Sequence, residues 1–181
     1  MTAPLSSADR AALLALARAA LLHRLGLSAP PMPPAAGRLA EPRGAFLTVV
    51  AGGEVRAALG TLDPAGPLAA AVARLGARAV DSDPRQPPLT AAEAASATLR
   101  LAVLGPRGPL PPGGLPRPGL DGLAIERDWH RGWLLPSAAS GKGWDGQAFL
   151  KHACLAAGLP ARAHLEPDTA VQLFEVEEFG E

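Results

Sequence analysis

Two strand-like runs joined by a pair of glycines constrain the fold of this chain more than any other feature of its sequence. Residues 46–50 are rich in aromatic and β-branched side chains, which favour strands. Gly52 and Gly53 follow, and glycine readily adopts the positive φ angles of a two-residue hairpin turn. Residues 55–61 then provide the return strand. The sequence therefore predicts an antiparallel hairpin.

Helix and strand patterns continue on both sides of this hairpin. A first helix is predicted for residues 6–25, where Ser6 and Asp9 stand at capping-box spacing. Prolines exclude a helix in residues 28–42, a connector that leads to the main body, residues 43–181. The later segments are a helix at about 67–79, a strand at 98–104, an irregular loop at 105–119, strands near 122–126 and 132–135, a helix at about 145–157 and a strand at 171–176. We expect an α+β fold in which about three helices flank a mainly antiparallel sheet, within a single domain of residues 1–181.

The composition narrows the classes of function. The chain has 181 residues with 17 basic and 17 acidic side chains, so no net field attracts nucleic acid or an anionic membrane. One cysteine allows neither an intramolecular disulfide nor a cysteine-based zinc cluster. No apolar run approaches the roughly 20 residues that a membrane span needs. We expect a cytoplasmic protein that binds neither nucleic acid nor membrane.

Nucleophiles and metal ligands are poorly represented. Cys154 falls within a predicted helix among apolar residues, which indicates a small buried side chain rather than a reactive thiol. No G-x-S-x-G motif is present. His152 is interpreted as a packing residue, and His130 is the better functional candidate, although a solvated surface role is favoured for it. None of the histidines has metal-binding spacing: His23, His130, His152 and His164. The sequence thus predicts no metal site and no cofactor.

Two loop motifs could bind an ion, but a structural role is the preferred interpretation of each. Asp81 and Asp83 could offer oxygen ligands to a divalent cation, yet aspartates before a proline commonly form turns. Residues 141–143, Gly-Lys-Gly before a helix, resemble an anion cradle but depart from the P-loop pattern. A turn and a flexible loop are the preferred interpretations.

Arginines in or beside turns remain as candidates. Arg56, Arg85 and Arg131 each present a planar fork of donors that can bind a carboxylate or phosphate through two hydrogen bonds. Structural salt bridges are the alternative, and the sequence leaves both open.

Seven segments in the same order resemble the AMMECR domain family, also called protein A of the AmmeMemoRadiSam system. They span nearly the whole chain and are residues 43–46, 55–61, 83–85, 119–123, 132–136, 143–150 and 157–160. The resemblance implies a single α+β domain built as two lobes, with a largely antiparallel sheet. It also implies an association with a Memo-type protein and a radical-SAM enzyme.

The chain departs from the family signature Leu-Arg-Gly-Cys-Ile-Gly-Thr within residues 55–61. Ala57 replaces the glycine and Ala58 replaces the cysteine, so no sulfur is present at that position. Elsewhere, Gln86 replaces a phenylalanine and Ser137 a glutamine. Three signature residues match: Arg56, Gly60 and Thr61.

These observations suggest a cytoplasmic accessory protein that binds a small anionic ligand or a partner protein of an AmmeMemoRadiSam system. The residues expected to bind are Arg56, Gly60, Thr61, Asp83, Arg85 and Asp121.

An enzyme is the alternative hypothesis. Asp121 or His130 would act as a general base while Arg56 stabilises an anion. A strongly perturbed pKa in a pocket shared with Arg56 would favour this alternative.

Overall fold

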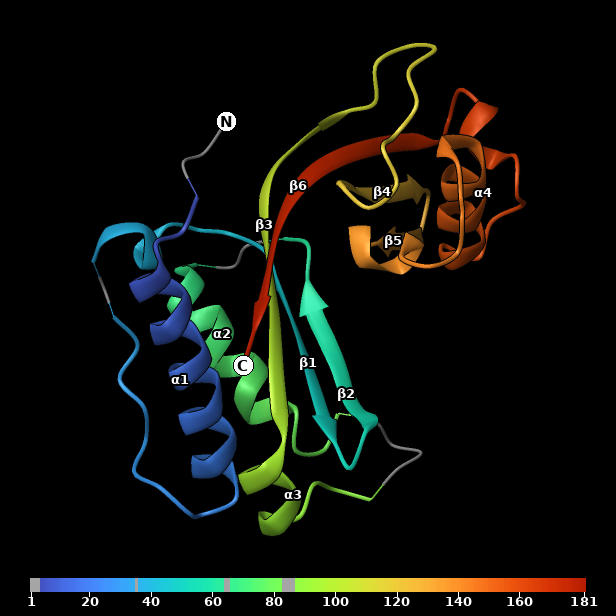
Figure 1. The fold of residues 1–181 in the computed structure, drawn as a ribbon. Coiled ribbons are helices and arrows are strands. Elements are labelled where there is room, and N and C mark those ends of the chain that lie inside the picture. The colour runs from blue at the N-terminus through green and yellow to red at the C-terminus, as the bar shows by residue number, and fades with distance from the viewer. Residues whose placement is uncertain (1–3, 35, 64–65, 83–86) are drawn as a thin grey trace. The chain divides into compact units, whose positions relative to one another are not determined.

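The computed structural model describes residues 4–34, 36–63, 66–82 and 87–181, and these residues form two compact units. Unit 1 comprises residues 1–104 and 177–181, and unit 2 comprises residues 105–176. Six strands are hydrogen-bonded in the order β2-β1-β3-β6-β4-β5, and four pairings, β1/β2, β1/β3, β4/β5 and β4/β6, are antiparallel. The elements (Figure 1) are α1 (Ser7–Arg24), β1 (Ala45–Ala51), β2 (Glu54–Thr61), α2 (Leu68–Arg78), α3 (Ala91–Ser96), β3 (Thr98–Pro109), β4 (Asp121–Arg127), β5 (His130–Leu134), α4 (Gly146–Ala156) and β6 (Ala170–Gly180). Short 3₁₀ turns occupy Gly37–Ala40, Pro136–Ala139 and Ala163–Leu165. The predicted α+β class is confirmed.

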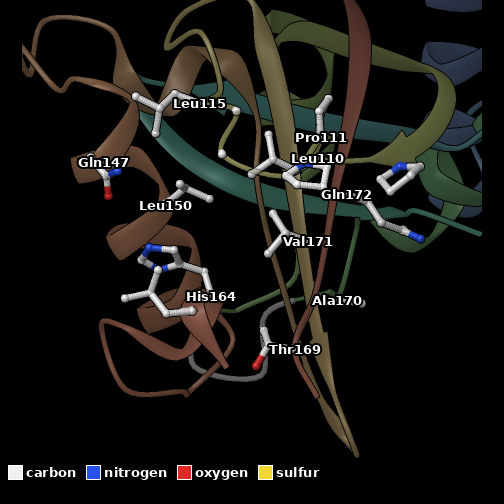
Figure 2. A pocket seen from close by; sticks show the side chains of 15 residues that line it. Leu110, Pro111, Leu115, Gln147, Leu150, His164, Thr169, Ala170, Val171 and Gln172 are labelled. Atoms are coloured by element: carbon white, nitrogen blue, oxygen red, sulfur yellow. The ribbon is translucent and has the colours of Figure 1, made fainter. Parts of the chain in front are cut away.

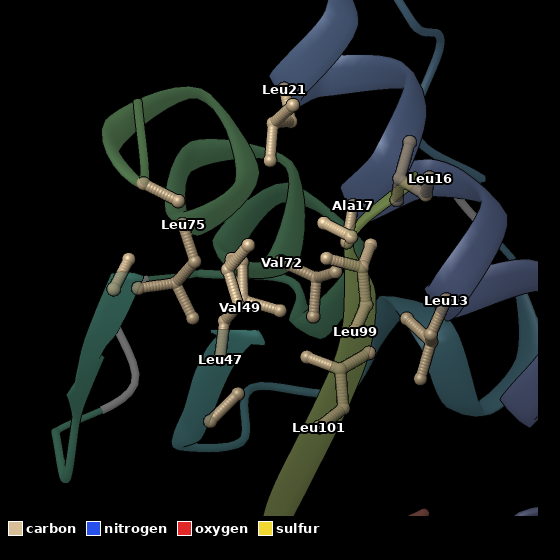
Figure 3. Close-up of a cluster of buried hydrophobic side chains, with 14 of the residues drawn as sticks. Leu13, Leu16, Ala17, Leu21, Leu47, Val49, Val72, Leu75, Leu99 and Leu101 are labelled. Carbon is tan, nitrogen blue, oxygen red and sulfur yellow. The ribbon is translucent and has the colours of Figure 1, made fainter. Parts of the chain in front are cut away.

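The core of unit 1 lies between the sheet and helices α1 and α2 (Figure 3). Leu47 and Val49 alternate along β1, so both point to the helical side of the sheet and are fully buried. The two helices approach closely at Gly76, where a Cβ would lie 2.3 Å from the carbonyl oxygen of Ala17. Other buried members of this core are Leu13, Leu21, Leu68, Val72, Leu99 and Leu101.

Capping boxes begin two helices of unit 1. The predicted pair at α1 is present, since the Ser6 hydroxyl accepts from the Asp9 amide and the Asp9 carboxylate accepts from the Ser6 amide. Thr90 and Glu93 form the same box before α3. The sequence expectation of about three helices left out α3, although the spacing of Thr90 and Glu93 indicated its start.

Unit 2 is built around α4, which packs against β4 and β5. Asp145 is the N-cap of α4, as predicted, and its carboxylate accepts from the Ala148 amide at 2.7 Å. Gly132 on β5 allows a close approach to the end of this helix, because a Cβ there would lie 2.2 Å from the backbone nitrogen of Ala157. The core is small and contains Leu123, Ile125, Ala139, Phe149, Leu150, Ala153, Cys154, Ala157, Leu159 and Ala163.

Two strands end four or more residues beyond their predicted boundaries. β3 continues to Pro109, through the first part of the loop expected at residues 105–119. β6 covers Ala170–Gly180 rather than residues 171–176. The glycines and prolines of residues 105–109 favour a loop when the sequence is considered alone. Pairing with a strand that is distant in sequence determines that these residues are extended.

In the part of the chain that the structure describes, no helix combines the length and apolar character needed to cross a membrane. Nor do three or more histidine, cysteine or acidic side chains gather there in a way that could hold a metal ion.

Candidate functional site

Arg56 lies at an irregular point of the hairpin. Val49 pairs with Ala57 while Val50 pairs with Val55, so Arg56 is the extra residue of a β-bulge on β2. Its side chain is only 12% exposed and forms an ion pair with Glu93. One guanidinium nitrogen also donates to the carbonyl of Pro87 at 3.0 Å. Arg56 therefore connects β2 to α3 through a charged pair and to the chain before α3 through a hydrogen bond.

Gly60 and Thr61 have structural contacts of their own. Gly60 pairs with Phe46 across the hairpin, and a Cβ at Gly60 would lie 2.1 Å from that ring, so only glycine fits here without movement. The Thr61 hydroxyl donates to the carbonyl of Asp63 at 2.9 Å and accepts from its amide at 3.2 Å. Both residues thus have a structural function at the end of β2.

The family's cysteine position is occupied by an exposed side chain. Ala58 is exposed on β2, whereas its neighbour Ala57 is buried at 3% exposure in the core of unit 1. The missing sulfur would therefore lie on the surface of the hairpin, outside the core.

Asp121 is held by a single neighbouring arginine. Its carboxylate is buried at the start of β4 and accepts from the Arg117 amide at 2.8 Å and from two Arg117 guanidinium nitrogens at 3.0 and 2.6 Å. Hydrogen bonds from the Arg117 side chain lower the pKa of Asp121 below its ordinary value. A general base needs a pKa near the working pH, and the shift of Asp121 is in the opposite direction.

His130 is the first residue of β5 and follows a tight turn. Asp128 in that turn has a positive φ of 52°. The ring of His130 lies 5.4 Å from that of Trp129, which is 83% exposed. The neighbouring Arg131 forms an ion pair with Glu126 at 3.5 Å.

The structure groups the candidate residues by unit. Arg56, Gly60 and Thr61 share β2 in unit 1, whereas Asp121 and His130 belong to unit 2. The remaining candidates, Asp83 and Arg85, lie outside the described residues.

The Gly-Lys-Gly loop before α4 carries an aromatic contact. The ammonium nitrogen of Lys142 lies 4.5 Å from the centre of the Trp144 ring, which stacks on His152 at 4.0 Å. A cation over an aromatic face is a favourable arrangement in itself. In this structure Lys142 and His152 both pack on Trp144.

A cavity in unit 2 was not indicated by any sequence motif (Figure 2). It has a volume of about 510 Å³, is partly open to solvent and is lined by the end of β3 with the chain that follows it, one side of α4, the turn at residues 163–165 and the start of β6. Its lining residues are Pro109, Leu110, Pro111, Pro112, Gly113, Gly114, Leu115, Gln147, Leu150, His164, Leu165, Thr169, Ala170, Val171 and Gln172. The sequence shows the irregular loop but gives no sign that the loop and α4 line the same cavity.

The polar groups at this cavity include a histidine that contacts the one cysteine. Nδ1 of His164 lies 3.6 Å from Sγ of Cys154. Burial raises the pKa of the Cys154 thiol, so the sulfur stays protonated at neutral pH. The prediction that Cys154 is a buried side chain is confirmed, and its contact with His164 is new.

An antiparallel six-stranded sheet, with one unit inserted in the chain of another, defines an α+β protein of two compact units. The AMMECR1 family model matches residues 14–179. A protein from Methanothermobacter thermautotrophicus is 36% identical over 189 residues, covering 99% of this chain and 97% of its own length. Protein MK0488 from Methanopyrus kandleri is 35% identical over 93% of this chain and 86% of its own. The chain belongs to the AMMECR1 family.

A solved structure supports the same relationship. The crystal structure of the uncharacterized protein PH0010 from Pyrococcus horikoshii superposes with a TM-score of 0.81 at 32% sequence identity. The similarity covers 93% of this chain and 89% of that one. The two proteins therefore share one fold over nearly the whole of this sequence.

Proposed function

We propose that this chain is a cytoplasmic accessory protein of an AmmeMemoRadiSam system that binds a partner protein, through an anionic group of that partner, and does not itself transform a substrate. The family membership supports the general role. The location of the binding site is inferred from the ion pair between Arg56 and Glu93. It places an arginine at a β-bulge on the outermost strand of the sheet, already bound to a carboxylate.

The two oxygens of Glu93 have separate functions. Oε2 accepts from the amide and hydroxyl of Thr90 and completes the cap of α3, while Oε1 contacts Arg56. Glu93 can therefore release Arg56 and still cap the helix. An acidic group of a partner would replace one carboxylate oxygen with another, so the exchange leaves no guanidinium without an anion.

The surface beside Arg56 suits a protein partner better than a small free anion. Val55 is 55% exposed and Ala58 is exposed on the same strand. Since β2 is outermost, its second backbone edge is not paired with another strand of the sheet. An extended acidic segment could contact the strand, its apolar side chains and Arg56 together.

Catalysis by Asp121 is less well supported. The hydrogen bonds that lower its pKa keep the carboxylate ionised and weakly basic. A small anionic ligand at Arg56 stays a second possibility, because the same exchange with Glu93 would admit it.

Co-purification with the Memo-type protein and the radical-SAM enzyme of the same genome tests the proposal. Arg56→Ala should weaken capture of the partner by about tenfold or more, since it removes a charge-assisted pair. Glu93→Gln should bind as well or better, because it removes the competing carboxylate. Arg131→Ala, an exposed arginine in another ion pair, is the matched control. Equal loss in the Arg56 and Glu93 variants, or none in Arg56→Ala, would contradict the proposal.

A further inference from the structure

We propose that the cavity of unit 2 binds an uncharged, mainly apolar small molecule that carries one hydroxyl or amide group. This site is separate from Arg56 and does not depend on the accessory role. The inference rests on the size of the cavity, the character of its walls and the polar atoms at one side.

The cavity is partly open to solvent and has the size of a ligand pocket. Its volume of about 510 Å³ falls within the range of roughly 300–1,000 Å³ that is typical of such pockets. A volume of this size has room for a molecule of metabolite size.

Apolar atoms form the larger part of the walls, which are partly exposed. Figure 2 shows the side chains of Leu110, Leu150 and Val171 around the same space. At the rim, Leu115 and Leu165 are 51% and 69% exposed. Each would lose contact with water when an apolar molecule enters, which stabilises the complex by about 25 cal/mol for each Å² of apolar surface buried.

None of the lining residues carries a permanent charge. Among the described residues that line the cavity there is no arginine, lysine, aspartate or glutamate, and His164 is the one titratable side chain. The neighbouring thiol of Cys154 stays neutral because burial raises its pKa, so it offers no anion to stabilise an imidazolium. A charged ligand would lose its hydration here without gaining a counter-charge. The site therefore favours a neutral ligand.

Two polar side chains define where the single polar group of the ligand would bind. Oγ1 of Thr169 is screened from water and has no hydrogen-bond partner among the described residues. The ring of His164 lines the same cavity, and its Nδ1 lies 3.6 Å from Sγ of Cys154. A buried polar atom without a partner is unfavourable, and a ligand hydroxyl or amide would satisfy the Thr169 hydroxyl.

Two glutamines, Gln147 and Gln172, also line the cavity. Oε1 of Gln172 has no hydrogen-bond partner among the described residues. Successive side chains of a strand point to opposite faces, and Figure 2 shows the Gln172 side chain directed away from that of Val171. We therefore place the polar group of the ligand at Thr169 and His164.

A series of probes that share one chain length and differ in charge tests the inference. Hexanamide, hexanol, hexanoate and hexylamine are titrated into the ¹⁵N-labelled protein, and amide chemical shifts are recorded. The two neutral probes should shift the amides of residues 109–115 and 163–172, and should bind about tenfold or more tightly than the two ions, a difference of about 1.4 kcal/mol. Equal binding of hexanoate, shifts confined to other regions, or no binding by any probe would overturn the proposal.

Variants separate the polar anchor from the apolar walls. Thr169→Val keeps the shape of the side chain and should weaken hexanol and hexanamide several-fold, while Thr48→Val in β1 is the matched control outside the cavity. Leu110→Trp should block both neutral probes by filling the space, and its amide spectrum shows whether the protein is folded. Arg56→Ala should leave probe binding unchanged, which separates this site from the proposed partner site. If a folded Leu110→Trp variant still binds both probes, the cavity is not their site; if an apolar peptide binds there and the probes do not, the ligand class is wrong.

Discussion

The two units pair their buried charges alike but differ in whether a cavity is built beside their polar atoms. In unit 1, Arg43 donates to the carbonyl of Leu104 at 2.9 Å and forms an ion pair with Glu177 at 3.0 Å. In unit 2, Arg117 forms the equivalent pair with buried Asp121. Unit 2 also places Oγ1 of Thr169, which has no hydrogen-bond partner among the described residues, at a cavity. Both units therefore use charged pairs to hold the fold, and unit 2 in addition offers a polar atom to a ligand.

The hydrophobic cores of the two units differ in size. Unit 1 has a broad core between a sheet and two helices, whereas the core of unit 2 depends on one helix, α4. A small core loses proportionately more when one large side chain is removed. The predictions that follow use matched changes in the two units.

Removal of the largest buried side chain in unit 2 should have the greatest effect. Phe149 is fully buried, and Phe149→Ala should reduce the free energy of unfolding by about 3–5 kcal/mol through the cavity it leaves. Leu47→Ala is the counterpart in unit 1, with an expected loss of about 2–5 kcal/mol.

Amide hydrogen exchange shows where the stability is lost. In Phe149→Ala, protection should fall in α4, β4 and β5 more than in α1 and β1. Leu47→Ala should give the reverse pattern. An equal fall across both units in either variant would show that they unfold as one, and the comparison would fail.

Two glycines at close contacts should give the next largest effect. In Gly132→Ala, the new Cβ would meet the backbone of Ala157 at 2.2 Å, which we expect to cost about 1–3 kcal/mol of stability. In Gly76→Ala the Cβ would meet the Ala17 carbonyl at 2.3 Å. Alanine has a higher helix propensity than glycine, which offsets about 1 kcal/mol of that cost. Chemical denaturation should therefore rank Gly132→Ala as the more destabilised. Gly108→Ala, which enters open space, is the control.

Lowering the pH should reduce the stability that one carboxylate in each unit contributes to the folded protein. The Arg117 side chain lowers the pKa of Asp121, and the Arg18 side chain lowers the pKa of Glu181. Because each folded-state pKa lies below the unfolded value, the stabilisation is complete above the ordinary pKa of about 4 and is lost as the pH falls through the lowered one. Asp121→Asn and Glu181→Gln should lower Tm at pH 7.

The difference from the unsubstituted protein should shrink toward pH 2, where the carboxylates are protonated in both states. Thermal melts between pH 2 and pH 7 measure this convergence. A deficit in Tm that stays constant over the whole range would show that the two carboxylates contribute through packing rather than charge.

Restoring the family's cysteine should have the smallest effect. Ala58 is exposed, so Ala58→Cys should change the free energy of unfolding by no more than about 0.5 kcal/mol. The new thiol should react with a maleimide in the folded protein, while Cys154 should not because it is buried. Partner capture by this variant would show whether the sulfur contributes to binding. If the new thiol does not react, position 58 is buried in the folded protein.

Local signals predicted the local structure well. The hairpin turn, the cap of α1 at Ser6 and the N-cap of α4 at Asp145 each follow from a few adjacent residues. The capping box of Thr90 and Glu93 was equally visible and would have revealed α3.

Contacts between distant residues could not be read from the sequence. Nothing near Arg56 indicates that its partner is Glu93, so a binding arginine and a structural one look alike. The cavity is the clearest example, because its walls come from four separate segments and only the fold brings them together. His164 and Cys154 likewise lie on either side of a turn whose geometry the sequence does not specify.

The insertion of unit 2 into unit 1 has a consequence for how the protein is made on the ribosome. Arg10, Arg18 and Arg43 are synthesised early, but their partners Glu177 and Glu181 follow unit 2 in the chain. At a synthesis rate of about 5–20 residues per second, the glutamates follow the arginines after several seconds or more. During that interval the edge of β3 that later pairs with β6 has no partner. The nascent chain must therefore keep this edge from aggregating until translation supplies the strand that covers it.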